Sequence, residues 1–232
     1  MFFEFPLAVL FVIFCLLFIL LYIVSRQSIQ QLFFVFHSIF RNDFIATSFI
    51  ALIFLPGTVI HELSHFFMAI FLFLPVHKLS LLPQRRGDGL ILGYVVYEKR
   101  DIVRGIIVGI APIIVGLLFF WWLYSIHFFA KDIWQIQALK VYGMFVLSST
   151  MFSSKQDLVD IAYVIPIILV IATIVYIFHI NLFFFLSNKS FVEAMRDFMY
   201  SVSMYASISL GIHIAIIIFC KSIARLLHIH YI

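Results

Sequence analysis

Charged residues are scarce in this chain of 232 residues, and the scarcity excludes an ordinary soluble domain. Asp, Glu, Lys and Arg make up 11% of the sequence and hydrophobic residues 65%, whereas globular domains carry about 25% charged residues. Apolar runs of about 18 or more residues recur, and each is long enough to cross a hydrocarbon core about 30 Å thick. We therefore expect an all-α polytopic membrane protein with five or six transmembrane helices, forming a single integral-membrane domain over residues 1–232.

Cysteine is also rare. Cys15 and Cys220 are the two in the chain, and both lie inside apolar stretches, where a cysteine is expected to be a buried core residue rather than half of a disulfide or a metal pair. The chain has no internal repeat, soluble domain or low-complexity linker. The net charge of +4 is modest and gives no reason to expect a nucleic-acid partner.

The first apolar run, Phe5 to Val24, lacks the features of a cleaved signal peptide. Glu4 stands where a basic segment would precede such a peptide, the run is longer than a usual signal core, and no small-residue cleavage site follows. We interpret it as a retained first span.

The remaining apolar runs predict further spans and one shorter segment. The spans are expected at roughly 5–24, 44–74, 102–126, 158–186 and 198–220. A run over about 138–153 is short enough to be a re-entrant helix, and the mixed polar and apolar residues 25–43 are expected to lie along the membrane interface. A break is expected at Pro56-Gly57 within the long second run, and Asp43 and Asp101 are expected to cap the helices that follow them.

The loop 75–101 holds the segment most typical of a β-strand. The stretch GLILGYVVYE, residues 89–98, is rich in β-branched and aromatic residues and follows the turn-like Gly87-Asp88-Gly89. It predicts a small hairpin or strand whose edge could pair with an extended peptide, although an ordinary surface hairpin fits equally well. The basic residues of this loop, Lys78, Arg85, Arg86, Lys99 and Arg100, favour the cytoplasmic side and an N-terminus inside the cell.

The segment His61-Glu62-Leu63-Ser64-His65 carries the strongest chemical signal. Residues four apart share a helix face, so both imidazoles can reach one point and form half of a tetrahedral zinc site, with Glu62 placed as a general base. The composition predicts about 0.006 chance matches to His-Glu-x-x-His. A carboxylate in mid-membrane costs at least about 2.5–3.5 kcal/mol, which favours a functional role. The alternative is a pair of packing histidines with Glu62 facing a neighbouring helix.

A third zinc ligand must come from elsewhere in the chain. Asp157 and Asp160 lie beside the entry to the expected span 158–186, and their spacing allows one helix face to present both. Either carboxylate would serve equally well as a helix cap. His179 and His213 are further candidates, but a single histidine in an apolar helix is more often a packing residue.

The sequence HELSHFFMAIFLFLPVHKLSLLP, which begins at His61, resembles the site-2 protease family of intramembrane zinc metalloproteases. GIAPIIVG (109–116) is similar to the small-residue span that follows in that family, and MFSSKQDLVD (151–160) resembles a variant of its second motif. The resemblance covers roughly residues 44–165, the expected catalytic core. It implies a Zn²⁺ ion held by His61, His65 and Asp157, with Glu62 as the catalytic base.

The chain departs from the commoner form of the second motif, which has an Asn-Pro pair and a Gly after the Asp; Asp160 therefore stays an alternative third ligand. The family also implies a transmembrane protein or peptide as substrate, within a lipid bilayer, and we expect the plasma membrane of a prokaryote. Two other functions fit the residues: a non-catalytic scaffold or regulator, and a metal-ion transporter that uses histidine and aspartate inside its spans.

Overall fold

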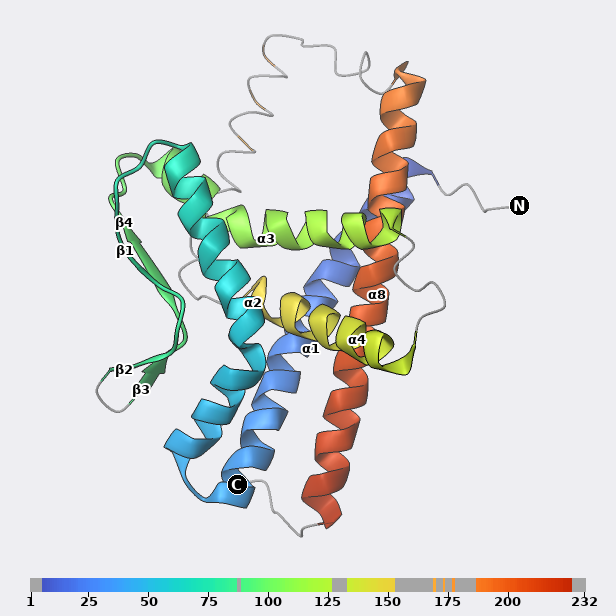
Figure 1. Ribbon diagram of the computed structural model, residues 1–232. Helices are drawn as coiled ribbons and strands as arrows, with labels where there is room; N and C mark the ends of the chain where they lie inside the picture. Colours follow the sequence, from blue (N-terminus) through green and yellow to red (C-terminus); the bar gives the residue numbers. More distant parts are fainter. Residues whose placement is uncertain are drawn as a thin grey trace.

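The computed structural model describes residues 6–86, 89–126, 133–152, 169, 173, 177 and 187–226. Helices dominate it, and a long β-hairpin is inserted between two of them (Figure 1). The elements are α1 (Leu7–Phe40), α2 (Asp43–Phe71), β1 (Val76–Ser80), β2 (Gln84–Arg86), β3 (Gly89–Ile91), β4 (Tyr94–Tyr97), α3 (Ile102–Ser125), α4 (Trp134–Thr150) and α8 (Lys189–Leu226).

Three long helices, α1, α2 and α8, form the frame, and the shorter α3 and α4 cross it (Figure 1). The most extensive packing joins α1 to α8, and α2 contacts α1, α3 and α4. Among the described residues, four helices are long and apolar enough to cross a membrane: α1, α2, α3 and α8. The expected span over 158–186 lies almost entirely outside the described residues.

The first helix is longer than expected. The sequence suggested a span ending near Val24 and an interfacial segment after it, but α1 continues without interruption to Phe40. Ser25 and Ser28 are buried rather than interfacial. Their hydroxyls donate to carbonyls one turn back, Ser25 to Tyr22 at 3.0 Å and Ser28 to Ser25 at 2.8 Å, so these polar residues are accommodated inside a helix.

The expected break at Pro56-Gly57 is also wrong, because α2 is one helix from Asp43 to Phe71. Gly57 has a different purpose: a Cβ placed there would lie 2.5 Å from Oγ1 of Thr150 and 2.6 Å from Cγ1 of Val146. The glycine therefore lets α4 cross α2 at close range. Tyr142 of α4 adds a hydrogen bond from its hydroxyl to the carbonyl of Ile53, at 2.7 Å.

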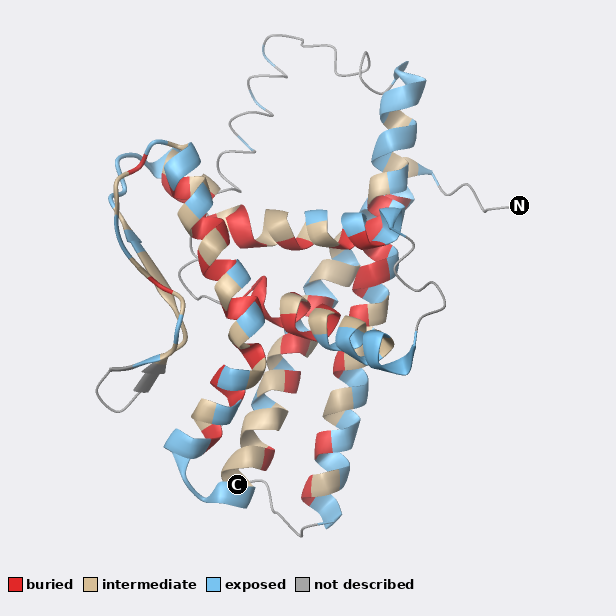
Figure 2. Cartoon of the chain, viewed as in Figure 1, coloured by how far each residue is buried: buried red, intermediate tan, exposed pale blue. Residues whose placement is uncertain are grey.

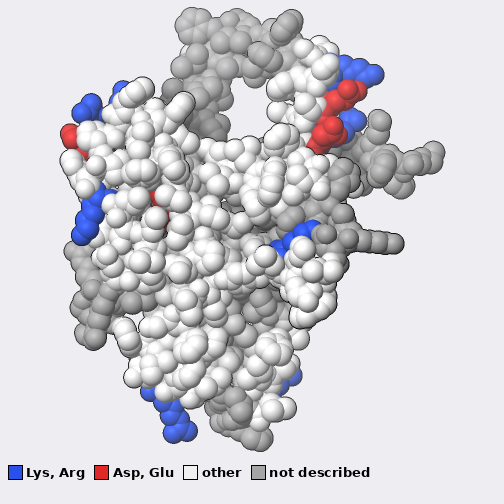
Figure 3. Space-filling view, viewed as in Figure 1, with Lys and Arg blue, Asp and Glu red and all other residues white. Residues whose placement is uncertain are grey.

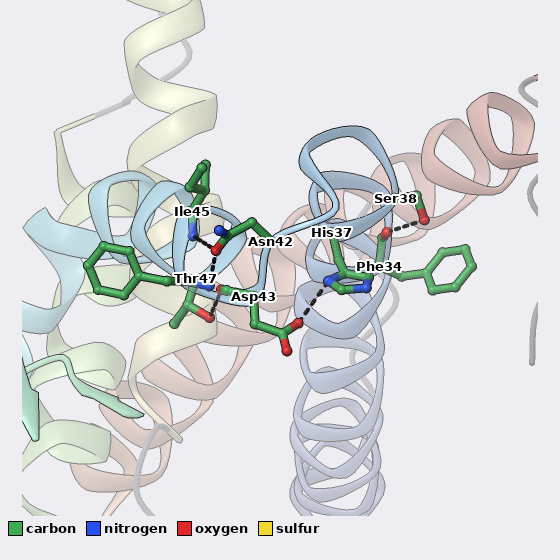
Figure 4. A network of polar contacts seen from close by, with 8 residues as sticks. Phe34, His37, Ser38, Asn42, Asp43, Ile45 and Thr47 are labelled. Atoms are coloured by element: carbon green, nitrogen blue, oxygen red, sulfur yellow. Dashed lines mark hydrogen bonds and ion pairs between the residues drawn. The ribbon is translucent and has the colours of Figure 1, made fainter. Parts of the chain in front are cut away.

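Helix caps follow the sequence in one case and differ from it in the other. Asp101 caps α3 as expected, accepting from the backbone N–H of Arg104 at 2.8 Å. At the start of α2 the cap is Asn42 and not Asp43, because Oδ1 of Asn42 accepts from the backbone N–H groups of Phe44 and Ile45. Asp43 instead pairs with Nδ1 of His37 at 2.7 Å and closes the corner between α1 and α2 (Figure 4).

The strands form one long irregular hairpin that runs alongside α2 (Figure 1). β1 pairs antiparallel with β4, and β2 pairs antiparallel with β3. The register places Ser80 opposite Tyr94 and Val76 opposite Tyr97, with an irregularity after Val76. The predicted strand material in 89–98 thus supplies both β3 and β4, separated by Leu92 and Gly93.

Two other boundaries differ from those expected. The short helix predicted over 138–153 is α4, Trp134–Thr150, and the last helix, predicted over 198–220, is α8, Lys189–Leu226. Buried residues gather where α3 and α4 meet the long helices, whereas the outer ends of these helices are mostly exposed (Figure 2). The terminal turns of α8 are mostly exposed and carry polar residues. Hydropathy alone therefore predicts a helix that is shorter than the one observed.

A buried histidine joins three of the helices. His213 of α8 has no exposed surface. Its Nδ1 lies 2.7 Å from the hydroxyl of Ser28 on α1, and its Nε2 lies 3.0 Å from the hydroxyl of Ser148 on α4. The His213 side chain therefore connects α8 to both α1 and α4, which fits the packing role expected for it.

Replacing His213 by leucine keeps most of the buried volume but removes both hydrogen bonds. We expect the free energy of unfolding to fall by about 1–2 kcal/mol, measured by chemical denaturation. The matched control is His37→Leu, whose partly exposed ion pair should contribute less than about 1 kcal/mol. Equal stability of the two variants would contradict a bridging role for His213.

Candidate metal and catalytic site

The residues of the His-Glu-x-x-His motif lie in the second half of α2, on the helix that the sequence predicts for them. His61, Glu62 and His65 are 5%, 8% and 8% exposed. Three side chains that ionise or ligate metals are thus almost completely withdrawn from solvent; the other buried polar side chains of the described residues are serines, threonines and His213. Burial of this kind is unfavourable unless each polar group has a compensating interaction.

The two imidazoles converge on each other. Nε2 of His61 lies 3.2 Å from Nε2 of His65, and the rings are inclined at 86°. Two nitrogens bound to one tetrahedral zinc ion at about 2.0–2.1 Å would be about 3.3 Å apart. The observed separation fits that edge of a zinc site, and it also fits a direct hydrogen bond in which one Nε2–H donates to the other nitrogen.

The neighbouring helix α3 orients one of these rings. Nδ1 of His65 lies 2.8 Å from the carbonyl oxygen of Val108. A carbonyl only accepts, so Nδ1 carries the proton and donates it. In the neutral ring the lone pair is then on Nε2, the nitrogen that faces His61, which is the arrangement that metal-binding histidines adopt with an outer hydrogen-bond partner.

Glu62 lies against the hairpin. A Cβ placed on Gly93 would be 2.7 Å from Cγ of Glu62 and 3.2 Å from Cγ2 of Thr58. Only a residue without a side chain allows the chain between β3 and β4 to come this close to α2. The hairpin therefore covers the carboxylate side of the motif with backbone, and restricts the space into which Glu62 can move.

A small cavity opens beside His61, between α2, α3 and α4. Its walls are mainly apolar, so the imidazole is one of few polar groups that a molecule entering it would meet. The lining residues are Gly57, Ile60, His61, Pro112, Val115, Gly116, Phe119, Leu147, Thr150 and Met151.

Of the candidates for a third ligand, the structure describes only His213. Within the described ranges, no group of three or more His, Cys, Asp and Glu residues is close enough to hold a metal ion. Asp157, Asp160 and His179 all fall outside those ranges. His213 is engaged by Ser28 and Ser148 instead.

Phe152, which follows α4 and is the last described residue before Asp157 and Asp160, packs against α1. Arg26 donates from Nη2 to the carbonyl of Phe152 at 3.0 Å. The ring of Phe152 packs edge-on against Tyr22 and Phe18 at centroid distances of 5.6 and 6.3 Å. The end of α4 also touches Gly57, one turn before His61. The last turn of α4, up to Thr150, therefore lies close to the turn of α2 that precedes the motif.

Sequence reasoning missed two contributors to the site, Val108 and Gly93. Both act through the backbone, so their own side chains carry no chemical signal. Gly93 stands within a strand-like stretch, and a glycine there is a sign of close approach by another chain segment. The comparisons with known proteins add nothing to these residues: no family model, no curated protein and no solved structure matches the chain.

Valine at position 57 should force α4 away from α2 beside His61. We expect Gly57→Val to lower the free energy of unfolding by about 1–3 kcal/mol through overpacking, measured by chemical denaturation. Gly143→Val is the matched control, because a Cβ at Gly143 on α4 meets nothing within 4 Å. A Gly57→Val protein as stable as the Gly143→Val protein would show that the two helices do not depend on this contact.

Proposed function

We propose that the chain is a membrane-embedded zinc metallopeptidase that resembles the site-2 protease family. The observation that carries this proposal is the convergence of His61 and His65, with their Nε2 atoms 3.2 Å apart and with one ring oriented by the carbonyl of Val108. A packing pair of histidines does not require a glutamate buried between them, whereas a metal-dependent hydrolase does.

Membrane embedding is supported by the surface as well as by the helices. Large apolar side chains point outward along α1 and α2, among them Phe11, Ile19, Leu52 and Phe67, each more than half exposed. Figure 3 shows one face with a broad uncharged area, and most of its charged side chains lie at the margins of that face. Lipid tails would cover such a surface, whereas water would leave it prone to aggregation.

The donor set present fits zinc, which favours imidazole nitrogen and carboxylate oxygen. We assign His61 and His65 as two ligands and Asp157 as the third, with Asp160 as the alternative. Zinc held there supplies the Lewis acid that polarises a peptide carbonyl and makes water acidic enough to attack near neutral pH.

Glu62 is the residue that handles the proton. Its place between the two histidines in α2 and its burial against Gly93 suit a general base that takes a proton from the attacking water and passes it to the leaving amine. Among the described residues β4 pairs only with β1, so its other edge has backbone groups to hold a substrate in extended form. A transmembrane helix must be unwound in this way before its peptide bonds are accessible.

Zinc content is the first measurement. We expect about one zinc ion per detergent-purified chain, lost in His61→Ala and Asp157→Ala and retained in Asp160→Ala, as determined by elemental analysis. His37→Ala, a histidine change outside the motif, is the control and should keep its zinc. Retention in Asp157→Ala together with loss in Asp160→Ala would move the third ligand to Asp160, and a folded wild type that takes up no added zinc would overturn the proposal.

Glutamine in place of Glu62 should leave the metal bound and stop hydrolysis. We expect cleavage of model single-span peptides, followed by mass spectrometry, to fall roughly 100-fold or more in Glu62→Gln because the base is lost. Glu98→Gln, at an exposed position after β4, is the matched control and should cleave like wild type.

Undiminished cleavage by Glu62→Gln would remove the glutamate from the mechanism. Zinc bound by a wild type that cleaves no peptide would favour the scaffold, and zinc carried into sealed proteoliposomes would favour a transporter.

A further inference from the structure

We propose that Pro112 is a positioning residue for the candidate metal site, acting on His65 through the carbonyl of Val108. This inference rests on the proposed function. Pro112 lies inside α3, which runs continuously from Ile102 to Ser125. Proline has no backbone N–H, so it cannot donate the α-helical hydrogen bond to the residue four positions earlier, and that residue is Val108.

The same carbonyl is the one that His65 contacts. Nδ1 of His65 lies 2.8 Å from the oxygen of Val108, although the two residues belong to different helices. Val108 and Ala111 have no exposed surface and Pro112 is buried, so water is not the partner that replaces the missing N–H. A side chain from a neighbouring helix compensates the carbonyl instead, as happens at prolines in apolar helices.

Each residue therefore resolves a problem created by the other. The proline leaves a buried acceptor without its helical donor, and the buried imidazole needs an acceptor for its Nδ1–H. The resulting hydrogen bond holds His65 in the tautomer whose lone pair is on Nε2, facing His61 at 3.2 Å. A ligand held in its binding tautomer before the metal arrives binds the metal more tightly.

Another proline inside a described helix provides an internal comparison. Pro56 lies in α2 and removes the donor to the carbonyl of Leu52, a residue whose side chain is 65% exposed. Leu52 is about 20 Å along the helix from His65. Substitution of Pro56 thus restores a helical hydrogen bond of the same kind without reaching the histidine.

The test is to give residue 112 an N–H that competes for the carbonyl of Val108. Pro112→Ala and Pro112→Val both do this, and the valine keeps a side chain of similar volume beside the cavity at His61. Pro56→Ala is the matched control. Zinc alone is the probe, its affinity measured by chelator competition on the detergent-purified full chain. Independently, ¹⁵N NMR of histidine-labelled, metal-free protein reports the tautomer of His65, assigned by loss of its signal in His65→Gln.

We expect zinc affinity to fall about tenfold in both Pro112 variants, the lower end of the range for an outer partner of a metal ligand, with a mixture of His65 tautomers in the metal-free protein. Pro56→Ala should match wild type in both measurements. An unchanged His65 tautomer in the Pro112 variants would overturn the inference, whatever happens to zinc affinity. If wild type binds no zinc the proposed function fails, while the tautomer of His65 still decides the role of Pro112.

Discussion

A buried imidazole needs partners for both ring nitrogens, and in this protein His65 meets the requirement by reaching from α2 to the carbonyl of Val108 on α3. That one hydrogen bond settles which nitrogen carries the proton and therefore which nitrogen faces His61. It also connects two of the three helices that enclose the cavity beside the motif. Without it, the ring would be free to rotate about its side-chain torsions, and the distance between the two Nε2 atoms would have no reason to match the edge of a metal site.

The same principle applies to His213 of α8. His213 is fully buried, and its nitrogens meet hydroxyls of Ser28 and Ser148 from two further helices. Other interior serines, such as Ser25 and Ser149, donate to carbonyls of their own helices. Buried histidines and Tyr205 thus cross-link the helices, whereas most buried serines and threonines bond within their own helix. His61, Glu62 and His65 differ because they gather on one turn.

The sequence predicted correctly those features that depend on a few adjacent residues. The helical placement of His61 and His65, the cap at Asp101 and the strand material in 89–98 all depend on a few adjacent residues, and the structure confirms them. The continuation of α1 past Val24 could not be predicted in this way, because one partner of the buried Ser28 is His213, which is far away in the sequence.

The break expected at Pro56-Gly57 was also wrong because a distant residue decides the structure there. Next to Pro56, Gly57 suggested a break, yet it permits the approach of Thr150 from α4. Helix-interior prolines are costly, at about 3 kcal/mol relative to alanine, and one persists where tertiary structure compensates for the missing hydrogen bond. At Pro112 the compensating donor is a histidine of the His-Glu-x-x-His motif. Two features that sequence analysis treats separately, a helix-breaking residue and a His-Glu-x-x-His motif, meet here at a single carbonyl.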